Sequence, residues 1–154
     1  MTFPVFSKCH VSLVKILLFF VAVSNVAFAG DYLIVTNKNN SVDSIPLKGA
    51  TSIFLGVQRV FVSGYEIEII DQPVNSDTYS KFYRLVTSKS VAQIRSRRAS
   101  LTFAGVSFPP EVVENDEEVL RWLEKHTNGI GYIGESSLDD RVKVLLRIPS
   151  KIED

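Results

Sequence analysis

Residues 115–133 have the sequence NDEEVLRWLEKHTNGIGYI, and this stretch decides the fold class. Asn115 followed by Glu118 is typical of a helix start, where both side chains accept hydrogen bonds from free backbone N–H groups. The helix that follows has one apolar side, formed by Val119, Leu120, Trp122 and Leu123. Asn128-Gly129 should end it, and a glycine-rich strand or turn follows over residues 130–134. A helix that leads directly into a strand indicates an α/β arrangement.

Upstream of this stretch, hydrophobic periodicity predicts an alternation of strands and helices. A short apolar run predicts a buried strand at residues 32–35, and apolar residues at helical spacing predict a helix over residues 47–54. Gly56 is placed to end that helix in a left-handed conformation.

A β-hairpin is expected next, because Ser63-Gly64 separates two extended runs, residues 57–62 and 65–70. Apolar and acidic residues alternate in the second run, so one face of that strand should be buried and the other exposed to solvent.

Three further elements complete the predicted order. An apolar stripe at helical spacing predicts a second helix, with Tyr79, Phe82, Tyr83 and Val86 as its buried side. A third, more polar helix is predicted over residues 91–98, followed by a rigid non-helical connection over residues 101–110. The last strand is predicted at residues 142–148.

Residues 1–29 are typical of a cleavable secretory signal peptide. Basic but no acidic residues precede an apolar run at residues 16–23, and Ala27-Phe28-Ala29 has the small-x-small pattern that signal peptidases accept. The apolar run is shorter than the roughly 20 residues that a membrane span needs, which favours a signal over a membrane anchor. We therefore expect export to the periplasm and one domain over residues 30–154.

The charge balance excludes a general affinity for nucleic acids. The chain has 17 Lys+Arg and 17 Asp+Glu, so loss of Lys8 and Lys15 with the signal leaves a net charge of −2. One basic run, Arg95-Ser96-Arg97-Arg98, is interpreted as a solvated helix face in preference to a basic binding patch. Cys9 is lost as well, so the mature domain has no thiolate for a disulfide or a metal site.

Few residues of the mature chain suit catalysis or metal binding. His126 is expected at a helix end, where it interacts with the helix dipole. Four acidic residues crowd the start of the last predicted helix: Glu114, Asp116, Glu117 and Glu118. There they favour the positive end of the dipole over a metal or acid–base site. Glycines spaced as in a dinucleotide-binding loop follow a helix instead of a strand, which argues against that loop; they are Gly129, Gly131 and Gly134.

One polar corner remains as a candidate ligand site, and it consists of Asn75, Ser76, Asp77 and Thr78. It joins a predicted strand to a predicted helix start, so it offers hydroxyl groups and backbone N–H groups that can hold an oxyanion. On residue types alone, helix capping without any ligand is the simpler interpretation.

Three segments, taken in order, resemble the phosphate-type substrate-binding proteins of ABC transporters. Residues 52–56, SIFLG, with the predicted hairpin behind them, are similar to the IFLG segment of that family. Residues 101–110, LTFAGVSFPP, resemble its F-x-G-x-x-x-P-P stretch, and residues 118–133 resemble its closing helix and G-x-IGY strand. The resemblance is greatest to short, exported single-domain members, in which a tryptophan tends to stand where this chain has Arg98.

This resemblance implies a fold and a function. The fold is α/β, a type 2 periplasmic-binding-protein-like single domain with a mixed sheet flanked by helices. The function is binding of phosphate or a similar inorganic oxyanion without catalysis or cofactor, in partnership with a membrane transporter or another periplasmic protein. The matching anion corner is Asn75, Ser76, Asp77 and Thr78, although the larger family members have a glycine-rich corner there.

Two alternatives to this function are open. The chain could be a periplasmic interaction or scaffold protein that kept the fold and lost the ligand, and an exposed apolar patch would favour that interpretation. It could also be a small exported enzyme, but the scarcity of histidine, cysteine and clustered acid–base residues argues against catalysis.

Overall fold

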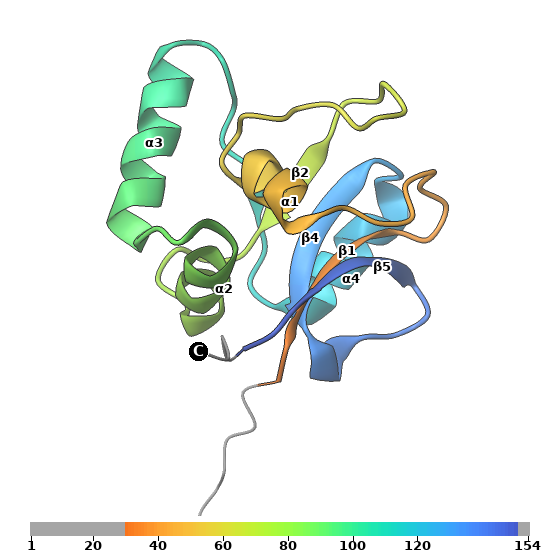
Figure 1. Ribbon diagram of the computed structural model, residues 1–154. Helices are drawn as coiled ribbons and strands as arrows, with labels where there is room; N and C mark the ends of the chain where they lie inside the picture. The colour runs from red at the N-terminus through yellow and green to blue at the C-terminus, as the bar shows by residue number, and fades with distance from the viewer. Residues whose placement is uncertain (1–29, 151–154) are drawn as a thin grey trace, which may run out of the picture.

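The computed structural model describes residues 30–150, which form a five-stranded sheet with helices on both faces (Figure 1). The predicted signal peptide, Met1–Ala29, lies outside the described residues. The strands are β1 (Tyr32–Asn37), β2 (Glu68–Asp71), β3 (Glu111–Val112), β4 (Gly129–Gly134) and β5 (Val142–Ile148). The helices are α1 (Leu47–Phe54), α2 (Asp77–Thr87), α3 (Val91–Phe103) and α4 (Asp116–Lys125), with a 3₁₀ turn η1 at Glu135–Ser137.

The sheet is mixed, in the order β3-β2-β4-β1-β5. The central strand β4 pairs antiparallel with β1 and parallel with β2, while β5 pairs antiparallel with β1 at one edge. The short strand β3 pairs parallel with β2 at the other edge. The expected α/β class and mixed sheet are therefore confirmed.

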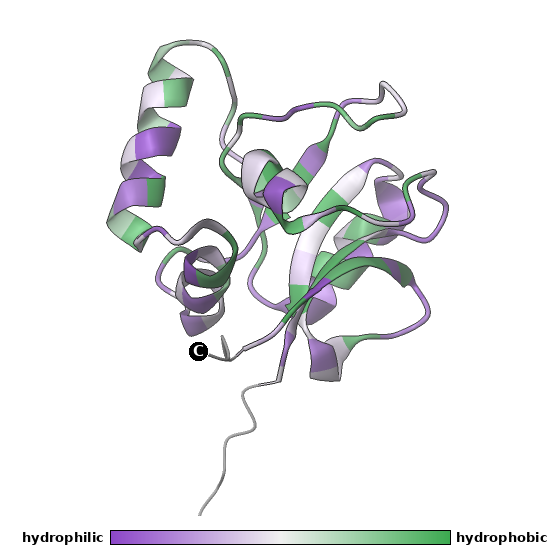
Figure 2. Cartoon of the chain, in the orientation of Figure 1, coloured by the Kyte–Doolittle hydropathy of each residue, from purple (hydrophilic) through white to green (hydrophobic). Residues whose placement is uncertain are grey.

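Alternating side chains of the central strands divide the apolar core between the two faces of the sheet. Ile34 of β1 packs with α1 and α2, whereas its neighbours Leu33 and Val35 pack with α4. The layer of α1 and α2 lies over one face and α4 over the other. In Figure 2, β1 and β5 are mostly green, whereas the helices that cover the sheet are partly purple. The result is three layers, with α3 against α2 at the periphery.

Aromatic rings fill much of the layer under α2. The Phe82 and Tyr132 rings stack with their centroids 3.7 Å apart and nearly parallel planes. Phe54 of α1 approaches Phe82 edge-on at 4.9 Å. The predicted stripe of α2 is confirmed, because Tyr79, Phe82, Tyr83 and Val86 are all buried.

Two helices end at a glycine in the same way. Gly56, with φ +71°, follows α1, and the N–H of Val57 donates to the Ser52 carbonyl. Gly105, with φ +65°, follows α3, and the N–H of Val106 donates to the Leu101 carbonyl. These are Schellman motifs, in which the left-handed residue closes the last helical turn. The left-handed end predicted at Gly56 is confirmed.

Two predicted boundaries are wrong. Residues 101–103 were expected in a non-helical connection, but α3 continues through Phe103 because its backbone bonds persist until Gly105. The predicted hairpin has one isolated bridge, Val60 with Glu66, and its second strand begins only at Glu68. The tip of the hairpin stands away from the core, so its residues are exposed, Tyr65 included.

The described region contains no helix that is both long and apolar enough to cross a membrane.

Candidate functional site

The four residues of the predicted anion corner meet at the start of α2. Ser76 is the N-cap, and its Oγ accepts a hydrogen bond from the Tyr79 N–H at 3.0 Å. The Ser76 N–H in turn donates to the Pro73 carbonyl at 2.8 Å, which fixes the turn before the helix. Asn75 and Asp77 are exposed and Thr78 is partly buried.

Two backbone donors at this corner have no acceptor within residues 30–150. The first N–H groups of a helix have no partner inside the helix, and here Ser76 supplies an acceptor to Tyr79 alone. The N–H groups of Asp77 and Thr78 therefore remain available to a ligand. The carboxylate of Asp77 adds a negative charge, and Lys81 one turn later pairs with it at 3.3 Å.

A buried carboxylate lies directly before the corner, at the end of β2. Asp71 has no exposed surface, and its Oδ1 accepts from the Tyr132 hydroxyl at 2.7 Å. Its Oδ2 accepts from the Tyr83 hydroxyl at 2.9 Å and lies 2.7 Å from Arg98 Nη2. The Gln72 N–H also donates to Oδ1, so both oxygens of the buried charge are satisfied.

The groups around Asp71 act as donors. Burial, followed by the charge of Asp71, raises the pKa of the Tyr83 and Tyr132 hydroxyls well above the usual tyrosine value, so both keep their protons. Burial opposes the charge of Arg98, but the neighbouring oxygens of Tyr83, Asp71 and Tyr79 outweigh it and raise its pKa. The Arg98 guanidinium also lies over the Tyr83 ring, 5.1 Å from its centroid.

Gln72 connects the corner to the start of α4. Its side-chain amide donates to Asp116 Oδ1 at 2.7 Å and to the Tyr132 carbonyl at 3.2 Å. The other oxygen of Asp116 accepts from the Gly134 N–H and the Ser137 hydroxyl. Asp116 therefore holds neighbouring segments in place by hydrogen bonds, a role additional to the helix-dipole interaction expected for the acidic residues here.

The structure also tests the sequence interpretations of the basic run and of His126. The solvated face predicted for residues 95–98 is wrong in part, because Arg98 pairs with Asp71 and Arg97 donates to the Leu55 carbonyl at 2.8 Å. His126 does end α4, where its ring stacks on Trp122 with centroids 3.6 Å apart.

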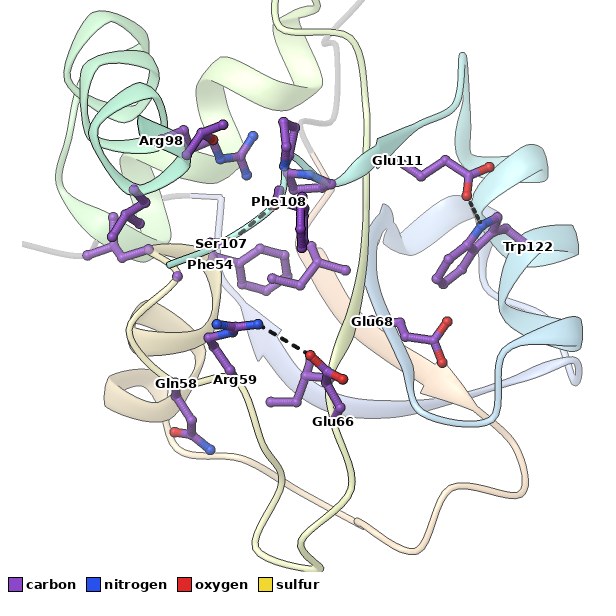
Figure 3. Close-up of a pocket in the computed structure, with 18 residues that line it drawn as sticks. Phe54, Gln58, Arg59, Glu66, Glu68, Arg98, Ser107, Phe108, Glu111 and Trp122 are labelled. Carbon is purple, nitrogen blue, oxygen red and sulfur yellow. Dashed lines mark hydrogen bonds and ion pairs between the residues drawn. The ribbon is translucent and has the colours of Figure 1, made fainter. Parts of the chain in front are cut away.

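A separate cavity of about 230 Å³ has Arg98 in its lining (Figure 3). Its walls are the end of α1, the hairpin, the end of α3 and the connection to β3, and Trp122 of α4 closes one side. None of the residues Asn75–Thr78 lines it. The sequence predicted neither this cavity nor Asp71, because both depend on residues brought together from distant parts of the chain.

The comparisons with known proteins identify the fold. Protein-family models and curated protein sequences give no match. Among solved structures, a phosphate ABC transporter substrate-binding protein from Clostridium perfringens, with bound phosphate, superposes with a TM-score of 0.62 at 21% identity. The match covers 76% of this chain and 45% of that one.

Two further solved structures agree. An ABC-type phosphate transport receptor from Vibrio cholerae gives a TM-score of 0.60 at 20% identity, covering 76% of this chain and 46% of the receptor. PstS from Borrelia burgdorferi gives 0.58 at 19% identity, covering 76% of this chain and 47% of PstS. The aligned part is thus a little under half the length of these structures. The resemblance to phosphate-type substrate-binding proteins is confirmed at the level of the fold.

Proposed function

We propose that this chain is an exported, non-enzymatic binding protein for phosphate or a similar oxyanion, and that Asn75, Ser76, Asp77 and Thr78 hold the anion. It would act in the periplasm with a membrane transporter or another periplasmic protein. The observation that carries the proposal is the start of α2, where the N–H groups of Asp77 and Thr78 lack acceptors within the described residues.

Physical chemistry supports this corner as an anion site. The N-terminus of a helix carries about half a positive charge, which favours an anion beside it. The Thr78 hydroxyl and the Asn75 amide can donate to oxyanion oxygens. The starts of the neighbouring helices are less suitable. Acidic side chains already crowd α4, and a complete capping box occupies the start of α3.

The fold neighbours support the ligand class. One of them contains phosphate, and the names of three refer to phosphate transport or PstS. At such low sequence identity these structures support the fold alone. That this chain binds an oxyanion is therefore part of the proposal. The proposal involves no cofactor.

Calorimetric titration with phosphate, sulfate and molybdate tests the proposal. Ser76→Ala should abolish the heat of binding, because loss of the N-cap loosens the turn that presents both N–H groups. Ser90→Ala is the matched control, since Ser90 caps α3 in the same way at a distance from the corner. Binding lost in both variants, or retained in both, would contradict the site. No heat with any oxyanion for the wild type would contradict the function.

One observation favours a second candidate function, that of an interaction protein. Large apolar side chains are exposed on the surface, among them Phe103 with 94% and Phe108 with 88% of its area accessible. Single exposed apolar residues are ordinary, but a group of them marks an interaction site. A wild type that binds no oxyanion but binds a protein partner would support this second function.

A further inference from the structure

The cavity beside Arg98 is lined by both apolar and charged side chains, and two of its walls are linked to each other. Phe54, Ile67, Ile69 and Leu101 contribute apolar side chains to its lining. Arg59 of the hairpin donates to the Val106 carbonyl and so connects the hairpin to the segment after α3. The same side chain pairs with Glu66 within the hairpin at 3.4 Å (Figure 3). The cavity is therefore formed before any ligand arrives, which lowers the entropy cost of binding.

The charges at the cavity are unbalanced. Of its two arginines, Arg98 is paired with Asp71 and Arg59 with Glu66. Glu68 lies 3.9 Å from the imidazole of His126, and Glu111 accepts only from the neutral indole N–H of Trp122 at 2.9 Å. Neither glutamate has a Lys or Arg partner among residues 30–150. Figure 3 shows both on the Trp122 side of the cavity, so that side favours a cation.

Most of the exposed large apolar residues lie on two segments that contribute to the cavity, and one of these residues, Phe108, lines the cavity itself. Of the eleven large apolar residues exposed in the described region, four lie on the hairpin and four on the segment from the end of α3 to β3. They are Val57, Val60, Val62 and Tyr65, and Phe103, Val106, Phe108 and Val112. Both segments line the cavity. Phe108, with 88% of its area accessible, continues the apolar lining to the surface, where a bound protein segment would cover it.

We propose that this cavity docks a protein segment in which an apolar or aromatic residue is flanked by Lys or Arg. The apolar residue fills the cavity above Phe54, and a basic residue pairs with Glu68 and Glu111. An interior of about 230 Å³ accommodates one large side chain as the anchor, and the exposed Phe108 packs beside it. This inference extends the second candidate function and uses none of the residues of the oxyanion corner.

Trp122 gives a direct readout, because it is the single tryptophan of the chain and lines the cavity. Intrinsic fluorescence of the full-length protein is titrated with a Gly-Lys-Phe-Lys-Gly peptide whose ends are blocked. Two matched peptides replace the Phe by Ala or both Lys by Glu. We expect a saturable change with the Lys-Phe-Lys peptide, weaker at high salt, and none with the other two. No saturation with Lys-Phe-Lys, or equal responses to all three, overturns the proposal.

Charge variants test the assigned residues. Glu68→Gln with Glu111→Gln keeps side-chain size and an acceptor for Trp122, and should weaken peptide binding about tenfold or more. Glu124→Gln with Asp140→Asn is the control, since it removes two carboxylates that do not line the cavity. Equal weakening in both double variants would indicate a general charge effect and overturn the site.

Two further measurements separate this proposal from its rivals. Phenethylamine provides the same cation and ring as a small molecule. If it saturates the fluorescence change at the same concentration as the peptide, the cavity is a small-cation site and the docking proposal fails. The Glu68/Glu111 variant should bind phosphate as the wild type does. Failure of phosphate binding in the wild type would leave the peptide result unaffected.

Discussion

Arg98 Nη2 and Asp71 Oδ2 lie 2.7 Å apart inside the protein, where Asp71 is completely buried. The pair joins the end of β2 to α3, a helix that also packs on α2. The Tyr83 hydroxyl of α2 donates to the same carboxylate oxygen. With Tyr132 of β4 on its other oxygen, this one buried charge holds four elements together.

Breaking this pair should be strongly destabilising. Arg98→Met leaves the Asp71 charge buried with neutral partners alone, the two tyrosine hydroxyls and the Gln72 N–H, and we expect a loss of about 3–5 kcal/mol in the free energy of unfolding. Arg95→Met on the exposed side of the same helix should change it by less than about 0.5 kcal/mol. Urea unfolding followed by circular dichroism measures both. Equal values for the two variants would show that the pair contributes nothing.

The sequence could not predict this cluster. Asp71 follows a predicted strand and precedes Pro73, a setting typical of an exposed loop. Its tyrosine partners lie 12 and 61 residues along the chain, and no local pattern connects them. The periodicity that placed α2 and α4 correctly reports which face of an element is buried, but not which polar groups meet there.

β4 packs so closely against its neighbours that position 131 requires glycine. A Cβ at Gly131 would lie 2.6 Å from Ile70 Cγ2 and 3.0 Å from Val119 Cγ1. Gly131→Ala should therefore destabilise the fold by about 1–3 kcal/mol. Gly49→Ala in α1 is the control, because its Cβ would make only ordinary contacts at 3.4 Å or more. It should stabilise the helix by about 0.5–1 kcal/mol. Thermal unfolding would contradict this explanation if both changes had the same sign.

The glycines of β4 also show what a sequence pattern can conceal. Gly129, Gly131 and Gly134 have the spacing of a dinucleotide-binding loop, but all three lie within one strand. The sequence argument against that loop relied on the preceding helix. The structure gives a further reason: α4 packs so closely on Gly129 and Gly131 that a Cβ at either position would meet its side chains. Similarly, Gly105 marks the true end of α3, although a non-helical connection was predicted from residue 101 onward.

The cap of α4 gives a smaller, local prediction. Asn115 Oδ1 accepts from the Glu118 N–H at 3.0 Å, as the sequence predicted. The carboxylate of Glu118, however, accepts from the Glu114 N–H, one residue before the expected donor. Asn115→Ala should cost about 1 kcal/mol in urea unfolding. Glu118→Gln keeps the acceptor and should cost clearly less; a larger loss than for Asn115→Ala would contradict this assignment.

Acid should weaken a surface ion cluster. Arg141 donates to Glu117 at 2.9 Å and to Asp139 at 2.8 Å, and these hydrogen bonds lower the pKa of both carboxyls. A lowered pKa contributes stability at neutral pH that is lost as the pH falls below about 4. Arg141→Gln should therefore be less stable than the wild type at pH 7, and the difference should shrink at about pH 3. Arg84→Gln, which removes an exposed arginine outside this cluster, is the control. A difference independent of pH would contradict the role of the carboxyls.

Asp77 should set the pH dependence of phosphate binding if the proposed corner is the site. Its exposed carboxylate stands at the helix start, beside the free N–H groups, and repels an anion that carries two charges. Wild-type affinity should therefore fall as the pH rises through about 7, where phosphate loses a further proton. Asp77→Asn removes the repulsion and releases Lys81 from its 3.3 Å ion pair. We expect tighter phosphate binding in this variant, with the greatest gain above pH 7.

Lys81→Gln, which removes the nearby positive charge, should bind phosphate more weakly. Calorimetry at pH 6 and pH 8, with circular dichroism as the folding control, measures all three proteins. An Asp77→Asn variant that binds phosphate no better than the wild type at either pH would place the anion elsewhere.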